Sequence, residues 1–156
     1  MDQIEIFAPA SVANVSCGFD VLGFCLEPIG DIMRVTKTES PGVTIGSVTG
    51  QELPTDPLKN VASVAVLSLL KSFKSSYGFR IDIDKKIKPG SGIGSSAASA
   101  AGAVFAVNQL LGAPYSRREL IKFAIAGEAL ASGAKHADNL APVLLGGFTL
   151  VRSNNS

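Results

Sequence analysis

The sequence predicts an α+β fold, and three observations support this prediction. Segments in the first half of the chain alternate apolar residues with others, which is the period of a strand with one buried face. Three longer segments between residues 57 and 131 have the apolar content of helices, and two of them carry helix-start residues. Hydrophobic residues make up 46% of the 156 residues and charged residues 17%, which is typical of one globular domain and not of a disordered chain.

The predicted strands come mainly from the first half of the chain. The alternation is clear at residues 3–8 and again in FRIDIDKKI, residues 79–87, where Phe79, Ile81 and Ile83 lie on one face and Arg80, Asp82 and Asp84 on the other. The sequence GGFTLVRS, residues 146–153, is typical of a strand that leaves a glycine turn. Between Pro, Gly and Asp residues we expect three further strands, at 21–26, 32–37 and 43–48.

Three helices are predicted from their start residues and composition. The first should begin near Pro57, because proline is tolerated in the first turn of a helix. The second follows a glycine-rich loop and should run to about Leu111. The third should run to about Ala131, and it opens with Ser116 and Glu119, whose spacing is that of a capping box.

Charge, cysteine content and hydropathy exclude several classes of function. The net charge is +1 and no Lys/Arg stripe is interleaved with aromatic residues, so we expect no nucleic-acid partner. Cys17 and Cys25 lack the spacing and companions of a metal site, and the N-terminus lacks the pattern of an export signal, so we expect a reduced, cytoplasmic protein. Residues 89–116 carry no charge, but Gly, Ser and Pro interrupt them too often for a membrane span.

The segment PGSGIGSSAAS, residues 89–99, lies between a predicted strand and a predicted helix. Glycines and serines there would expose backbone N–H groups at the positive end of the helix, which favours a bound phosphate. A lysine-containing P-loop is excluded, because Gly94 is followed by two serines. The dinucleotide pattern G-x-G-x-x-A is present, but its acidic partner is not, since the candidate Glu119 belongs to the capping box. A tight turn without a ligand remains an alternative for such a loop.

Three segments together resemble a known family. PGSGIGSSAAS resembles the ATP-binding signature of the GHMP kinases, although Lys88 stands where the family usually has its proline. Residues 8–26 and 127–148 resemble the two substrate segments of the homoserine kinase branch of that superfamily. Because the family proteins are longer, we expect residues 1–156 to be the N-terminal, ATP-binding domain, with the C-terminal GHMP domain absent from this chain.

The resemblance implies a fold and a reaction. The fold is that of the GHMP kinase N-terminal domain, which is ribosomal protein S5 domain 2-like, with a mixed β-sheet and packed helices. The reaction is Mg²⁺-dependent transfer of the γ-phosphoryl group of ATP to the side-chain hydroxyl of L-homoserine, in threonine biosynthesis. Alternatives are another GHMP small-molecule kinase and a non-catalytic nucleotide-binding module. A homodimer is possible, and this chain alone is expected to be inactive.

The resemblance also assigns site residues. Mg²⁺ would be held by Ser96 and Glu128, and Glu128 and Asp20 would be the catalytic residues. Homoserine would be bound by Asn14, Asp20, Asp138 and Asn139, although turn formation is the ordinary role of such residues. The nucleotide would be bound by Asn60 and by Pro89, Gly90, Ser91, Gly92, Ile93, Gly94, Ser95, Ser96, Ala97, Ala98 and Ser99.

Glu128 also stands out from the residues alone. It shares a helical face with Ile121, Ala124 and Ile125, and no Lys or Arg lies three or four residues away to pair with it. A carboxylate on an apolar face is expected to have a partner or a metal, the alternative being an exposed edge of the helix. No general base is evident, and none of the five arginines lies in a matched motif.

Overall fold

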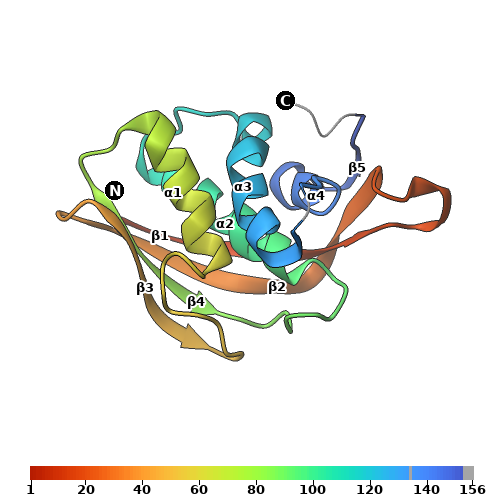
Figure 1. Cartoon of the computed structure of the whole chain (residues 1–156), viewed down its shortest axis with the longest axis horizontal. Coiled ribbons are helices and arrows are strands. Elements are labelled where there is room, and N and C mark those ends of the chain that lie inside the picture. Colours follow the sequence, from red (N-terminus) through yellow and green to blue (C-terminus); the bar gives the residue numbers. More distant parts are fainter. Residues whose placement is uncertain (134, 153–156) are drawn as a thin grey trace.

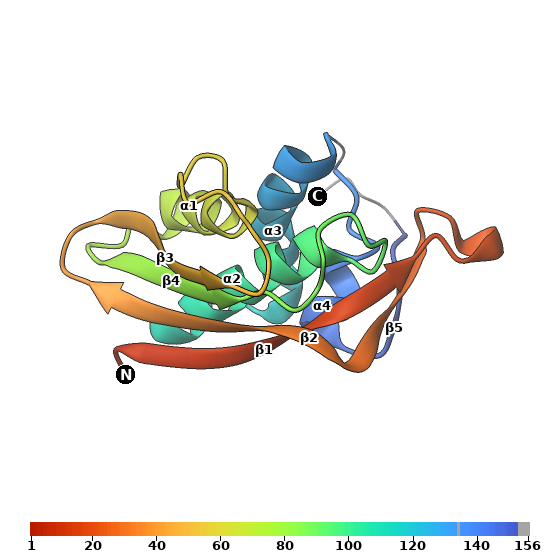
Figure 2. The same cartoon turned by 90° about the horizontal axis from the view of Figure 1, so that it is seen from below.

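The computed structural model describes residues 1–133 and 135–152 and consists of one mixed β-sheet with helices on one face (Figures 1 and 2). The strand order is β1-β2-β4-β3, and β5 pairs with β2. Only β3 and β4 are parallel, whereas β2 runs antiparallel to β1, β4 and β5. The strands are β1 (Gln3–Ala13), β2 (Leu22–Thr38), β3 (Gly42–Thr49), β4 (Gly78–Asp84) and β5 (Phe148–Leu150).

The sheet packs against a helical layer whose centre is α2 (Figure 2). Small residues allow this close packing: a Cβ atom on Gly102 of α2 would come within 2.8 Å of Ala8 and Met33 in the sheet. Nearly all of α2 is buried, as its uncharged composition predicts. The helices are α1 (Val61–Phe73), α2 (Ser95–Leu110), α3 (Arg117–Ser132) and α4 (Leu140–Leu145), and a 3₁₀ turn spans Ser16–Gly18. None of the helices in the described part is both long and apolar enough to cross a membrane.

The prediction of separate strands at 21–26 and 32–37 is wrong, because both belong to the single strand β2. Ala10 of β1 pairs with Leu26, whereas its neighbour Pro9 pairs with Gly30. Residues 27–29 therefore bulge out of the ladder without ending the strand, and this is one of the ways in which a sheet accommodates a proline. The bulge leaves the rest of β2 in register with β4.

The first helix starts later than predicted. Asn60 has an extended backbone (φ −97°, ψ 126°), and its side-chain oxygen accepts hydrogen bonds from the N–H groups of Ala62 and Ser63. Asn60 is therefore the N-cap of α1 and does not lie in its first turn, because its side chain satisfies N–H groups that have no acceptor within the helix. The short helix α4 was not predicted, because it has only six residues, one of them Pro142.

The other predicted elements are confirmed with small changes of bounds. The capping box of α3 is present: the Ser116 hydroxyl accepts from the Glu119 N–H, and the Glu119 carboxylate accepts from the Ser116 N–H. The strands predicted at 43–48 and 79–87 correspond to β3 and β4, although β4 ends at Asp84. The last predicted strand is confirmed as β5, and its final residue, 153, lies outside the described residues.

Candidate functional site

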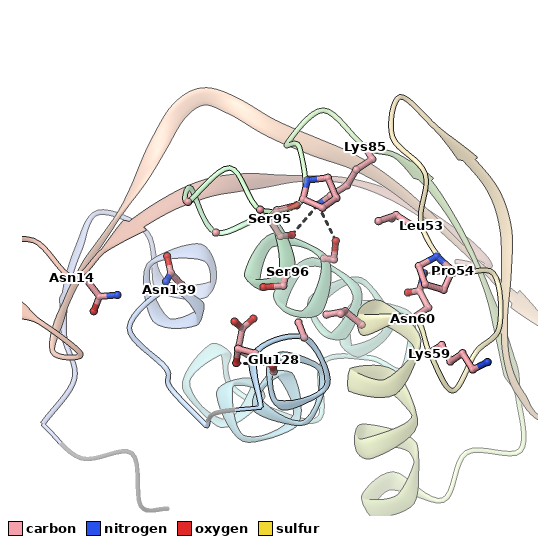
Figure 3. A pocket seen from close by; sticks show the side chains of 18 residues that line it. Asn14, Leu53, Pro54, Lys59, Asn60, Lys85, Ser95, Ser96, Glu128 and Asn139 are labelled. Carbon is pink, nitrogen blue, oxygen red and sulfur yellow. Dashed lines mark hydrogen bonds between the residues drawn. The ribbon is translucent and has the colours of Figure 1, made fainter.

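A pocket of about 530 Å³ opens at the N-terminal end of α2 (Figure 3). Its walls come from the glycine loop (residues 89–94), the starts of α1 and α2, and the last turns of α3. Eleven residues predicted for the site line it, namely Asn14, Asn60, Pro89, Gly90, Gly92, Gly94, Ser95, Ser96, Ser99, Glu128 and Asn139. The other predicted residues, which are Asp20, Ser91, Ile93, Ala97, Ala98 and Asp138, are not among those that line it.

The glycine loop has a backbone that only glycine adopts easily. Gly92 has φ +81°, and a Cβ atom there would meet no described atom within 4 Å, so the space above the loop is open. Gly94 is the N-cap of α2 and brings no side-chain cap to the N–H groups of the first turn. Unpaired N–H groups at the start of a 16-residue helix attract an anion.

Gly94 also lies against two polar side chains from distant parts of the chain. A Cβ atom on Gly94 would collide with the Ser11 hydroxyl on β1. That hydroxyl donates a hydrogen bond of 2.9 Å to the side-chain oxygen of Asn139, just before α4. The predicted substrate residue Asn139 is thus held beside the predicted phosphate loop, as Figure 3 shows.

Glu128 is half-buried on α3, and its Oε2 is buried without a hydrogen-bond partner among the described residues. Burial raises the pKa of Glu128, and the nearby Asp138 carboxylate raises it further. The Ser96 hydroxyl and His136 act against this rise in pKa. A buried carboxylate oxygen that has no partner from the protein is expected to bind a cation.

The pair Ser96 and Glu128 fits a magnesium ion. Hydroxyl and carboxylate oxygens are ligands that Mg²⁺ prefers, and it usually takes only one or two from the protein and the rest from phosphates and water. No group of three or more His, Cys, Asp or Glu side chains arranged for a metal occurs within 1–133 and 135–152. The two residues lie where a phosphate on the glycine loop could supply the remaining oxygens.

Of the remaining predicted substrate residues, Asn14 lines the pocket, whereas Asp20 and Asp138 do not. Asn14 accepts a hydrogen bond of 2.9 Å from the backbone N–H of Asp20, so these two residues are adjacent as expected. The Asp20 carboxylate lies 3.8 Å from His136 Nδ1. Asp138 is 3% exposed, and burial raises its pKa, with Asp20 adding to the rise. The acids therefore form a group that favours a bound cation, such as the ammonium of an amino acid.

Asn60 lies at the other end of the pocket, but its side chain is already in use. Its oxygen caps α1, and its amide nitrogen donates a hydrogen bond of 2.7 Å to the carbonyl of Pro54. One amide hydrogen remains for a ligand, since the group has two. Its neighbours in the pocket are the apolar side chains of Leu53, Pro54 and Val61.

A buried ion pair between Asp31 and Lys85, at the edge of this pocket, was not predicted from the sequence. The pattern that could have indicated it is the strand alternation, which puts Lys85 on the same side as Ile81 and Ile83. Asp31 shares the buried side of β2 with Met33 in the same way. A charge on the apolar side of a strand is expected to be paired.

Replacing Glu128 with glutamine is expected to raise the free energy of unfolding of the ligand-free chain at neutral pH. The raised pKa means that the folded chain holds the Glu128 proton more tightly than the unfolded chain, whose ordinary pKa is 4.5. The stability contributed by protonated Glu128 is complete below that pH and is lost as the pH rises through the raised pKa, whereas glutamine does not titrate. Denaturant unfolding at several pH values should show that the unfolding free energy of the variant exceeds that of the unmodified chain increasingly as the pH rises. A variant that is less stable at neutral pH would contradict this prediction.

Comparisons with known proteins identify the family of this chain. The family described as GHMP kinases N terminal domain matches residues 60–147. Homoserine kinases of Chloroherpeton thalassium and Methanococcus maripaludis are 48% and 46% identical, each over 98% of this chain and over 52% and 51% of their own lengths. The chain thus spans about half the length of the curated relatives that it matches.

Solved structures give the same result for the fold. The crystal structure of homoserine kinase from Cytophaga hutchinsonii has a TM-score of 0.92 and 50% identity, covering 98% of this chain and 49% of that one. The mevalonate kinase of Methanococcus jannaschii shares the fold (TM-score 0.72) at 16% identity. The predicted α+β fold of the GHMP N-terminal domain is therefore confirmed. Because the family match at residues 60–147 covers more than half of the chain, the chain belongs to the GHMP kinases.

Proposed function

We propose that this chain is the ATP-binding part of a homoserine kinase, which transfers the γ-phosphoryl group of ATP to the hydroxyl of L-homoserine. The observation that carries the proposal is the Glu128 carboxylate beside Ser96, because its Oε2 is buried and has no hydrogen-bond partner among the described residues. It lies at the edge of a glycine loop whose backbone N–H groups could bind a phosphate. The homoserine kinases at 46% and 48% identity support this choice of acceptor. The likeness to mevalonate kinase supports only the fold.

In the proposed mechanism the chain binds and orients its reactants. The N–H groups of the glycine loop and of the first turn of α2 bind the phosphates, and Ser96 with Glu128 would hold Mg²⁺. The ion, when bound, neutralises charge that develops during phosphoryl transfer. Asp20 would accept the ammonium group of homoserine, and Asn139, fixed by Ser11, would orient the rest of the molecule. Phosphoryl transfer depends mainly on such positioning, so no general base is assigned.

The carboxylate of homoserine has no guanidinium partner in the described pocket. The cationic residues that line the described pocket are Lys59 and Lys85, and none of its lining residues is an arginine. Each charge-assisted hydrogen bond that is missing costs about 1.5–3 kcal/mol, so the substrate would bind weakly to this surface alone. We therefore propose that the other half of a homoserine kinase supplies these donors.

The proposal is tested with two proteins, the chain itself and a chimera in which the C-terminal half of the Cytophaga hutchinsonii enzyme follows it. We expect the chain to bind ATP but to release no ADP with homoserine. The chimera should release ADP with homoserine and not with mevalonate, shikimate or galactose. Equal or greater turnover with another acceptor would identify a different GHMP kinase, and ATP binding without turnover on any acceptor would favour a non-catalytic module.

A further inference from the structure

The buried ion pair of Lys85 and Asp31 lies between the two ends of the glycine loop. The Lys85 side chain is 1% exposed and that of Asp31 is 0% exposed. Lys85 directly follows β4, and Asp31 lies next to it in β2. The ion pair therefore lies at the end of the ladder between β2 and β4. Neither residue has a role in the proposed mechanism.

The ammonium of Lys85 fixes the far end of the loop. Besides Asp31, it donates to the carbonyl oxygen of Ser95 at 2.8 Å and to the hydroxyl of Ser99 at 3.0 Å (Figure 3). Both belong to the first turns of α2, directly after the loop. An ammonium has three hydrogens, and all three are used, so Lys85 does not reach a ligand without breaking one of these contacts.

The carboxylate of Asp31 fixes the near end of the loop. Its Oδ1 accepts the backbone N–H groups of Lys86 at 2.8 Å and Ile87 at 2.9 Å, which directly precede the loop. The hydroxyl of Ser95 completes the arrangement with a bond of 3.0 Å to the carbonyl of Ile87. Residues 85–87 and the start of α2 are thus tied to each other, with the glycine loop between them.

A buried ion pair is not an efficient way to stabilise a fold. Each charge loses its hydration, and apolar residues of similar size often give equal or greater stability. Directional hydrogen bonds from a fixed charge do what apolar packing cannot, because they set the distance and orientation of the backbone groups that they bind. Here those groups are the two ends of the glycine loop.

We propose that Lys85 and Asp31 are positioning residues that hold both ends of the glycine loop at the separation needed to bind a nucleotide's phosphates. This inference rests on the proposed function, because it takes the loop to be the phosphate site. A loop that is already held in its binding geometry loses little conformational freedom when the ligand binds. The ion pair should therefore increase ATP affinity.

The test compares two variants with a matched control. Lys85→Met breaks the pair and leaves Asp31 buried alone, whereas Lys85→Met/Asp31→Leu replaces both charges with apolar side chains. The control is Lys86→Met, which removes the adjacent lysine from an exposed ion pair with Asp84. For each protein, calorimetry with MgATP gives the affinity, denaturant unfolding gives the stability, and amide hydrogen exchange without nucleotide reports on the glycine loop.

We expect Lys85→Met to lose both stability and affinity. The double variant should regain most of the stability, but it should still bind ATP about tenfold or more weakly, with faster exchange in the loop, because both anchors are missing. Lys86→Met should match the unmodified chain in affinity and loop exchange. Should the double variant not fold, Ser99→Ala removes one contact of Lys85 without leaving a charge unpaired, and the same changes are expected on a smaller scale.

Two outcomes separate this inference from the proposed function. A folded double variant with unchanged ATP affinity and unchanged loop exchange would make the ion pair structural only and overturn the inference. If the unmodified chain binds no ATP, the proposed function fails, and loop exchange alone then decides whether the pair holds the loop. Unchanged exchange in the folded variant, either the double variant or Ser99→Ala, would overturn the inference in that case as well.

Discussion

The chain with Gly92 replaced by valine is expected to bind ATP at least about 100-fold more weakly than the unmodified chain, a loss comparable to one or two charge-assisted hydrogen bonds. Gly92 has φ +81° and lines the pocket, so a branched side chain both disfavours this backbone and occupies the space that a phosphate would fill. Calorimetric titration with MgATP measures the loss directly.

A matched control is available in Gly112, which has φ +85° and also has no described atom within 4 Å of an added Cβ, but does not line the pocket. Gly112→Val should cost similar stability and leave ATP affinity unchanged. Gly94 is a poorer position than Gly92 for this substitution, because a side chain added there would also collide with Ser11 and disturb the fold. Unchanged affinity in folded Gly92→Val would show that the loop is only a tight turn.

In the chimera, Glu128→Gln is expected to lower kcat by a factor on the order of 10² or more, as for the loss of one group that stabilises charge in the transition state. Glutamine keeps the size of the side chain and removes the charge that would hold Mg²⁺. The ligand-free protein should remain folded and gain stability at neutral pH, so the loss would not come from misfolding.

Steady-state kinetics over a range of Mg²⁺ concentrations, with Glu39→Gln as an exposed control, measure this effect. The variant should also need more Mg²⁺ for half-maximal ATP binding, whereas the control should not differ from the unmodified chimera. A defect confined to the KM for homoserine would instead assign Glu128 to the substrate and not to the metal.

The features that could be predicted from the sequence depend on neighbouring residues. The capping box at Ser116 and Glu119 and the glycine turn before α2 are each made within one short segment. The family, and with it the proposed site, followed from segments long enough to resemble known sequences. The start of α1 was placed too early because Pro57 and Asn60 are both helix-start residues, and only the structure shows which one caps the helix.

The features that were missed depend on distant residues. Lys85 and Asp31 are 54 residues apart, and their pairing requires β2 and β4 to be neighbours in a known register. The continuity of β2 through Pro28 likewise depends on β1, because Pro9 and Ala10 pair with the residues on either side of the bulge at 27–29. A single sequence contains the alternation of each strand but not the order of strands, so these contacts could not be derived.

The central place of α2 has a thermodynamic consequence. Its first turn carries the N–H groups that we propose bind phosphate, while the rest of the same helix is buried against the sheet and against α1 and α3. This binding surface is therefore not expected to open by local unfolding, because it cannot detach without taking the core apart. Bound nucleotide should then raise the global unfolding free energy by the full RT ln(1 + [L]/Kd), and substitutions deep in α2, such as Gly102→Val, would weaken nucleotide binding from a distance.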